Sequence, residues 1–134
     1  MPGYSGTPLS KKLGLTEGLV MYVVNSPSDY FDWLAPLPGK LIVKDKLSGE
    51  MDFIHLFVRE FRVFEKEFVN GKSHLKKTGM LWVSWPKKSA KVPTDLDENL
   101  IREFGLKNGL VDVKVCAVDE VWSGLKFMFR IKDR

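Results

Sequence analysis

The feature that most constrains the fold is the stretch of residues 75–88, where a short apolar run is bounded by a glycine and a proline. The apolar run covers residues 80–83 of a predicted strand at 80–85, and such nearly continuous hydrophobicity is typical of a strand covered on both faces of a sheet. Gly79 can adopt a positive φ, so we expect it to close a helix-to-strand turn. Pro86 cannot donate a ladder hydrogen bond, which places the end of the strand near Trp85. The stretch therefore predicts a helix end, a tight turn, a central strand and a basic loop.

Five other segments are typical of strands, because they are apolar runs or alternate apolar with polar residues. In chain order they are residues 19–24, 41–43, 53–58, 111–117 and 125–131. The last two are joined too closely for a crossover helix, so we expect them to pair as an antiparallel hairpin. In the first strand of that hairpin, Val113 and Val115 are expected on the core row and Cys116 facing outward.

Helices are predicted between these strands. Apolar residues recur at spacings of three, four and seven over residues 60–75. Ser26 before Pro27 is typical of a helix start directly after the first strand. Thr94 with Asp97 resembles a capping box for a second long helix. Strands separated by helices predict an α/β fold with a mainly parallel sheet.

Length and composition set further limits. With 134 residues the chain is expected to hold a flexible segment at 1–9 and one domain at 10–134. The net charge of +4 is too small to argue for duplex nucleic acid. The single cysteine cannot form an internal disulfide, and no apolar run approaches the ~20 residues of a membrane span. We therefore expect a cytoplasmic protein that does not enter a membrane.

At residues 52–57, 75–83 and the closing hairpin, the chain resembles a small class I S-adenosylmethionine-dependent methyltransferase. That resemblance implies a Rossmann-like three-layer sandwich, in which a mostly parallel six-stranded sheet carries a C-terminal antiparallel hairpin. The chain more closely resembles a family of small bacterial proteins known only as a domain of unknown function, at residues 53–59, 79–88 and 111–126. This second likeness covers about residues 8 to 130 and implies a fold without a known activity.

The chain departs from the methyltransferase pattern at the cofactor turn. The enzymes have a glycine-rich turn after the first strand, whereas residues 25–29 here contain no glycine. Asp45 lies at the separation where such folds place an acidic residue for ribose hydroxyls, although it is also readable as a solvated loop aspartate. The pattern also lacks one helix–strand unit at the sheet edge. Our first expectation is therefore a chain without a cofactor, with S-adenosylmethionine as the alternative.

The candidate ligand site lies at the carboxyl ends of the strands, where open α/β sheets bind ligands. Its residues are Asn25, Ser26, Ser28, Asp45, Arg59, Trp85, Lys87 and Lys88. Backbone N–H groups at a helix start near Ser26 would favour an anion, unless that serine only caps the helix. Trp85 beside two ammonium groups could stack a flat anionic ligand such as a nucleotide, or it could cover the hydrophobic edge of the sheet.

No catalytic or metal-binding set emerges from the sequence. His55 lies among apolar residues and is expected to be a hydrogen-bonded core histidine, and Cys116 has no base beside it in sequence. The leading hypothesis is a non-catalytic domain that binds a small anionic or nucleotide-like ligand or a protein partner. The alternatives are a methyltransferase with a non-standard cofactor turn, and a structural homo-oligomer that pairs through an exposed edge strand at residues 111–117.

Overall fold

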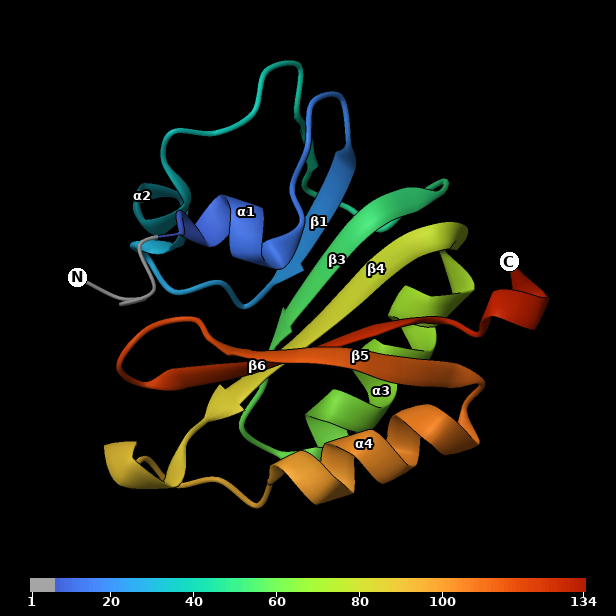
Figure 1. Cartoon of the computed structure of the whole chain (residues 1–134). Coiled ribbons are helices and arrows are strands. Elements are labelled where there is room, and N and C mark those ends of the chain that lie inside the picture. The colour runs from blue at the N-terminus through green and yellow to red at the C-terminus, as the bar shows by residue number, and fades with distance from the viewer. Residues whose placement is uncertain (1–6) are drawn as a thin grey trace.

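One sheet with the strand order β2-β1-β3-β4-β6-β5 organises the computed structural model, which describes residues 7–134 (Figure 1). The strands β2, β1, β3 and β4 run parallel, and β6 is antiparallel to both β4 and β5. This confirms the predicted mostly parallel sheet with a C-terminal hairpin. The strands are β1 (Val20–Val24), β2 (Ile42–Lys44), β3 (Met51–Phe57), β4 (Leu75–Pro86), β5 (Leu110–Ala117) and β6 (Trp122–Phe129).

Helices cover both faces of this sheet, so the fold is a three-layer sandwich. The helices α3 and α4 pack on one face, and the short helices α1 and α2 pack on the other (Figure 1). The helices are α1 (Leu9–Leu13), α2 (Tyr30–Leu34), α3 (Phe61–Ser73) and α4 (Glu98–Lys107), with 3-10 turns η1 (Lys88–Ala90) and η2 (Ile131–Asp133).

The α3/α4 face is held together by aromatic rings. Phe68 of α3 meets Phe64, Phe104 and Phe127 edge to face, with ring centroids 5.3–5.6 Å apart. Gly105 of α4 lets that helix approach the sheet, because a Cβ there would lie 2.1 Å from the ring of Phe127. The helical periodicity of the sequence therefore marks the side of α3 that packs on the sheet.

The α1/α2 face depends on contacts between the short helices and the sheet. The indole Nε1 of the fully buried Trp82 donates a 2.9 Å hydrogen bond to the carbonyl oxygen of Leu13 at the end of α1. Gly14 then ends the helix with φ 87°. Leu13, Tyr30 and Leu34 are fully buried against the strands, so these helices contribute side chains to the core despite their length.

The prediction for Gly79 was wrong. It does not close a turn but lies inside β4, which begins at Leu75, two residues after the end of α3. A Cβ at Gly79 would lie 3.0 Å from the carbonyl oxygen of Met51 and 3.1 Å from that of Asp52. The glycine thus permits a close approach of β4 to β3, where the register of the pair shifts between Met51 and Phe53.

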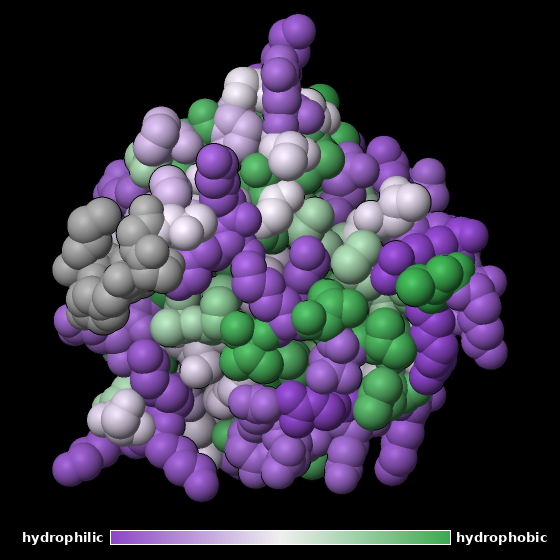
Figure 2. All heavy atoms as spheres, viewed as in Figure 1, coloured by the Kyte–Doolittle hydropathy of each residue, from purple (hydrophilic) through white to green (hydrophobic). Residues whose placement is uncertain are grey.

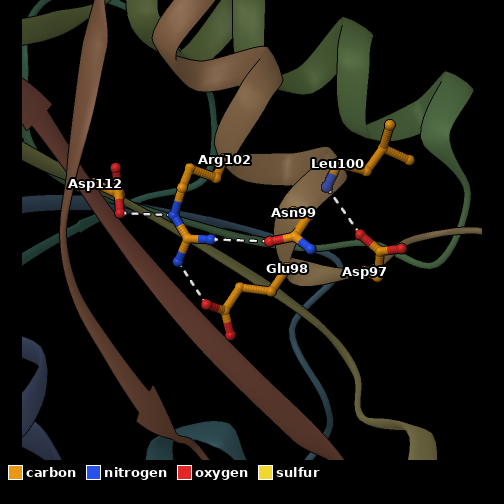
Figure 3. Close-up of polar contacts among 6 residues, drawn as sticks. All are labelled: Asp97, Glu98, Asn99, Leu100, Arg102 and Asp112. Atoms are coloured by element: carbon orange, nitrogen blue, oxygen red, sulfur yellow. Dashed lines mark hydrogen bonds and ion pairs between the residues drawn. The ribbon is translucent and has the colours of Figure 1, made fainter.

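Two predicted helix starts were also displaced. The helix α2 begins at Tyr30 rather than beside Ser26, and Asp29 at its N-cap makes no side-chain capping bond. The helix α4 is capped by Asp97, whose Oδ1 accepts a 2.8 Å hydrogen bond from the Leu100 amide (Figure 3). Thr94 instead donates its hydroxyl to the carbonyl oxygen of Arg59, which ties the loop before α4 to the end of β3.

Arg102 fixes α4 against the edge strand β5. Its Nε donates to Asp112 at 2.8 Å, its Nη1 to Asn99, and its Nη2 to Glu98 one turn earlier (Figure 3). The hydrogen bond to Glu98, followed by that to Asp112, raises the pKa of this guanidinium above its ordinary value.

The alternation predicted for β5 was wrong in register. A shift between Asp112 and Lys114 leaves Val113 as an extra residue, a β-bulge that reverses the facing of the later residues of the strand. Val113 and Val115 are 46% and 48% exposed, whereas Cys116 packs against the core of the α1/α2 face. Burial raises the pKa of the Cys116 thiol, although the nearby Lys12 and Lys114 act in the opposite direction. Figure 2 shows hydrophobic atoms gathered on the surface over β5.

Among residues 7–134, none of the helices has the length and apolar character needed to cross a membrane.

Candidate functional site

The carboxyl ends of β1 and β3 define the candidate site. From β1 the chain continues to β2 on one side, while from β3 it continues to β4 on the other, so these neighbours form the switch point of the sheet. A pocket of about 370 Å³ opens there, within the size range of small-molecule sites. Its lining residues are Asn25, Phe57, Val58, Arg59, Glu60, Val63 and Trp122.

Asn25 shapes one wall of this switch-point pocket. It follows the last residue of β1 and has φ 56°, the left-handed region that favours glycine and tolerates asparagine. The backbone therefore turns sharply at the end of β1, although the segment contains no glycine. The side chain of Asn25 is exposed at the pocket.

Arg59 supplies the positive charge of the pocket. It follows the buried Val58 at the end of β3, and its side chain is exposed. None of the ion pairs formed by residues 7–134 includes Arg59. Its backbone is held in place, because its carbonyl oxygen accepts hydrogen bonds from the Thr94 hydroxyl at 2.6 Å and the Asp95 amide at 3.2 Å. The guanidinium is thus a cation on a fixed backbone, available to an anionic ligand.

Two aromatic side chains that the sequence analysis did not assign to the site form the apolar part of the pocket. The rings of Phe57 and Trp122 meet edge to face at 5.1 Å. Phe57 is in turn stacked on the imidazole of His55 at 4.2 Å. The strand β6 begins at Trp122, and the side chain of this residue is half buried. The sequence around Trp122, which lies two residues before Gly124, does not by itself predict that this side chain lines the pocket.

A buried polar network lies beneath this aromatic pair. His55 Nδ1 is 2.8 Å from the Tyr30 hydroxyl, and His55 Nε2 is 2.7 Å from the Ser84 hydroxyl. All three side chains are fully buried, which confirms the expectation of a hydrogen-bonded core histidine. Burial lowers the pKa of His55 to about 3 and raises the pKa of the Tyr30 phenol. The network is therefore neutral near pH 7, and the imidazole of His55 supports the ring of Phe57 from beneath.

A second pocket of about 310 Å³ lies at the carboxyl end of β4. Trp85, Lys87 and Lys88 line it together with the start of α4. Trp85 is only 6% exposed and belongs to the core of the α3/α4 face, so most of its ring is not open for stacking. A third pocket of about 360 Å³ shares Arg59 with the switch-point pocket and Thr94 with this second pocket.

The predicted site residues thus fall into three groups. Asn25 and Arg59 share the switch-point pocket, while Trp85, Lys87 and Lys88 share the neighbouring one. Ser26, Ser28 and Asp45 line neither, and all three are exposed. Because α2 starts only at Tyr30, Ser26 and Ser28 do not stand at a helix N-terminus. Asp45 directly follows β2, beside the end of β1.

Several solved structures with a similar fold are methyltransferases. The chain superimposes on precorrin-6y C5,15-methyltransferase from Geobacter metallireducens GS-15 with a TM-score of 0.61 and 11% identity, covering 91% of this chain and 86% of that one. Aeropyrum pernix fibrillarin, in complex with natively bound S-adenosyl-L-methionine, gives a TM-score of 0.61 and 12% identity over 95% and 71% of the two chains. Magnesium protoporphyrin IX methyltransferase from Synechocystis PCC 6803, with bound SAH, gives 0.57 and 11% over 91% and 78%.

The fold is methyltransferase-like. At 11–12% identity, these similarities define the fold alone. No protein-family model and no curated protein sequence matches the chain. The resemblance to a small bacterial family of unknown function therefore stays a prediction.

The expectation of a chain without a cofactor is contradicted by these comparisons. Several of the similar structures contain SAM or SAH, including fibrillarin and the magnesium protoporphyrin IX methyltransferase. The expectation rested on the missing glycines of the cofactor turn. The left-handed φ of Asn25 shows that a sharp turn after β1 forms without glycine.

Proposed function

We propose that the protein binds S-adenosylmethionine, or a closely related adenosyl thioether, in the switch-point pocket. The observation that carries this proposal is the left-handed Asn25 at the end of β1, which lines one pocket together with the Arg59 cation and the aromatic side chains of Phe57 and Trp122. It replaces the sequence-based hypothesis of an unspecified small anionic or nucleotide-like ligand.

The backbone at the turn is compatible with a cofactor. A ligand that lies across the end of β1 needs the chain to turn away at once, and the φ of 56° at Asn25 provides that turn. The first residue with a buried side chain after this turn is Tyr30, which points into the core of the α1/α2 face. Residues 26–29 therefore run along the surface of the protein and do not line the pocket.

The side chains around the pocket match the parts of such a ligand. The guanidinium of Arg59 can pair with the carboxylate of the methionyl group, because Arg presents a planar set of donors to carboxylates. The half-buried Trp122 offers an aromatic surface for adenine. Asp45, which follows β2 outside the pocket lining, is the acidic side chain of the adjacent strand that would meet ribose hydroxyls of a ligand extending from the pocket.

When bound, S-adenosylmethionine supplies a methyl group on an electrophilic sulfonium. Arg59 and Asp45 would orient the two ends of the ligand, while Phe57 and Trp122 would exclude water from its apolar part. Phe57 is held in place by its stack on His55, so this part of the pocket is formed before a ligand arrives. The proposal concerns binding and requires no acceptor substrate.

A melting scan with S-adenosylmethionine and S-adenosylhomocysteine tests the proposal. Ligand at 100 times its dissociation constant adds about 2.7 kcal/mol to the free energy of unfolding. For a domain of this size we expect the melting midpoint to rise by roughly 10 °C. The absence of any shift at millimolar concentrations of both ligands would rule the proposal out.

Two arginine variants place the ligand within the molecule. Calorimetric titration of Arg59→Ala should give an affinity about tenfold weaker, because a charge-assisted hydrogen bond is lost. Arg62→Ala is the matched control, since Arg62 is exposed on α3 but does not line the pocket. Equal losses of affinity in both variants would show that the ligand is attracted by overall charge and is not held at the pocket.

A further inference from the structure

The strand β2 forms one edge of the sheet and is only half covered on each of its faces. Ile42 and Val43 point to opposite faces, as successive strand residues do, and they are 51% and 50% exposed. Strands of a parallel sheet are ordinarily covered on both sides. The neighbouring β1 follows that rule, because Val20 packs against the α3/α4 core and Met21 is fully buried on the other side.

The backbone of β2 is paired on one side only. The amide of Ile42 donates a 2.9 Å hydrogen bond to Leu19, at the start of β1. Because backbone groups alternate sides along a strand, the amide and carbonyl of Val43 face away from β1. In the sheet formed by residues 7–134, β2 has no neighbour beyond β1. The edge is therefore able to accept one further strand.

The opposite edge of the sheet is protected. There β5 contains the bulge at Val113, and Lys114 lies beside it with its ammonium donating to the carbonyl oxygen of Lys12. Bulges and edge lysines are devices that hinder the addition of a strand. The edge strand β2 has no register shift in its pairing with β1, so only this edge is open to regular pairing.

The charge around β2 indicates the chemistry of the added strand. Lys40, Lys44 and Lys46 flank the exposed pair, against a single acid, Asp45. Of these three lysines, only Lys40 forms an ion pair with another residue of 7–134: its ammonium lies 3.8 Å from the exposed carboxylate of Glu17. A second copy of this chain would bring the same excess of lysines against itself, whereas an acidic strand would be attracted.

We propose that β2 is a docking edge for an extended segment of another polypeptide in which apolar residues alternate with acidic ones. The segment adds as a seventh strand: its main chain pairs with Val43, its apolar side chains cover Val43 on one face, and its carboxylates lie on the face of Ile42, where they meet Lys44 and Lys46. This surface is separate from the switch-point pocket, whose lining includes no residue of β2. The docking edge does not depend on whether the pocket binds S-adenosylmethionine.

Fluorescence anisotropy with a labelled peptide, Glu-Val-Glu-Val-Glu-Val-Glu, tests the proposal on the full chain. We expect saturable binding that weakens as salt is added, and no binding of the peptide in which lysine replaces each glutamate. Failure of the acidic peptide to bind at millimolar protein, or equal binding of both peptides, would overturn the proposal.

Matched variants on the two edges locate the contact. Ile42→Asp should weaken binding of the acidic peptide at least tenfold, while Val113→Asp on β5 should change it less than twofold. Both positions are about half exposed, so both variants should keep the wild-type melting midpoint within a few degrees. Equal effects of the two substitutions would contradict docking at β2. Sedimentation that shows a wild-type dimer lost in Ile42→Asp would also overturn the proposal, because the occupant would then be a second copy.

Discussion

The two faces of the sheet are built by different means. On one face, α3 and α4 contain 13 and 10 residues and bury a set of interlocked phenylalanine rings. On the other, α1 and α2 contain five residues each, and the sheet beneath them carries the Tyr30–His55–Ser84 network. Helices of five residues are unstable in isolation, so the α1/α2 face exists only through its tertiary contacts.

This difference matters at the candidate site, because the switch-point pocket lies where the two faces meet. Phe57 belongs to the core of the α1/α2 face, while Val58 and Val63 belong to the other. The polar network holds Phe57, and the aromatic core supports the start of α3. The pocket therefore depends on both kinds of packing. The stability of the polar network depends on pH, whereas that of the aromatic packing does not.

The largest expected effect is that acid destabilises the α1/α2 face, which contains His55, and spares the aromatic packing of the α3/α4 face. Between pH 6.5 and about 3, the unfolded chain binds a proton at His55 that the folded chain does not, because burial lowers the folded pKa to about 3. The stability from a neutral His55 is therefore complete above pH 6.5 and is lost as the pH falls. At 1.36 kcal/mol per pH unit, the loss between pH 6.5 and 4 is roughly 3 kcal/mol.

Urea titrations over this pH range measure the loss. The ring of His55 faces Tyr30 from α2, Ser84 and Trp82 from β4, and Phe53 and Phe57 from β3, and none of these is an acid. His55→Gln is the control and should lose most of the slope, whatever its absolute stability. An unchanged slope in that variant would show that carboxylates elsewhere cause the acid sensitivity.

On the α3/α4 face, the close approach of α4 to the sheet is the feature most sensitive to substitution. Gly105→Ala places a methyl group 2.1 Å from the ring of the fully buried Phe127, so we expect a loss of up to about 3 kcal/mol in the free energy of unfolding. Gly71→Ala in α3 is the matched control, since its nearest contact is the Leu81 Cδ1 at 3.2 Å and helix propensity favours alanine. Denaturant midpoints that fall equally in both variants would contradict this packing.

The hydroxyl of Tyr30 tests the network without removing bulk. Tyr30→Phe leaves one nitrogen of His55 without a partner in a buried site, which should cost about 2 kcal/mol. Phe31→Leu, at an exposed neighbouring position on α2, should cost well under half of that. A Tyr30→Phe variant as stable as the wild type would show that the hydrogen bond contributes nothing net.

The smallest effect is expected at Arg102. Its contacts to Glu98 and Asp112 are partly exposed, with side-chain exposures of 27–44%, so the pairs contribute little in water. Arg102→Ala should lower stability by about 1 kcal/mol or less, measured by denaturation at low salt, and the deficit should shrink at 1 M salt. A loss several times larger would mean that α4 is anchored by charge and not by its aromatic residues.

The sequence predicted best what local patterns decide. The apolar runs of β3 and β4 and the periodicity of α3 identify these elements, because burial on a sheet or along a helix imposes its own spacing. Short elements were predicted less well. The start of α2 was predicted at Ser26 instead of Tyr30, because a five-residue helix has too few turns for its periodicity to mark its ends.

Errors at Gly79 and Val113 share a different cause, which is contact between distant segments. The close approach of β4 to β3 and the bulge opposite β6 each depend on a neighbour that the local sequence does not reveal. The candidate site has the same character. Asn25 and Arg59 were predicted because the ends of strands can be recognised in the sequence. Phe57 and Trp122 line the pocket because the strand order brings them together, which the sequence does not reveal.

The most direct test of adenosyl thioether binding at the switch point is an NMR titration of the uniformly ¹⁵N-labelled protein with S-adenosylhomocysteine. We predict saturable shifts at the amides of Asn25 and Arg59 and at the indole N–H of Trp122, with the signals of Lys88 and Val113 unmoved. A spectrum that stays unchanged at millimolar ligand, or whose shifts gather around Lys88, would contradict binding between β1 and β3.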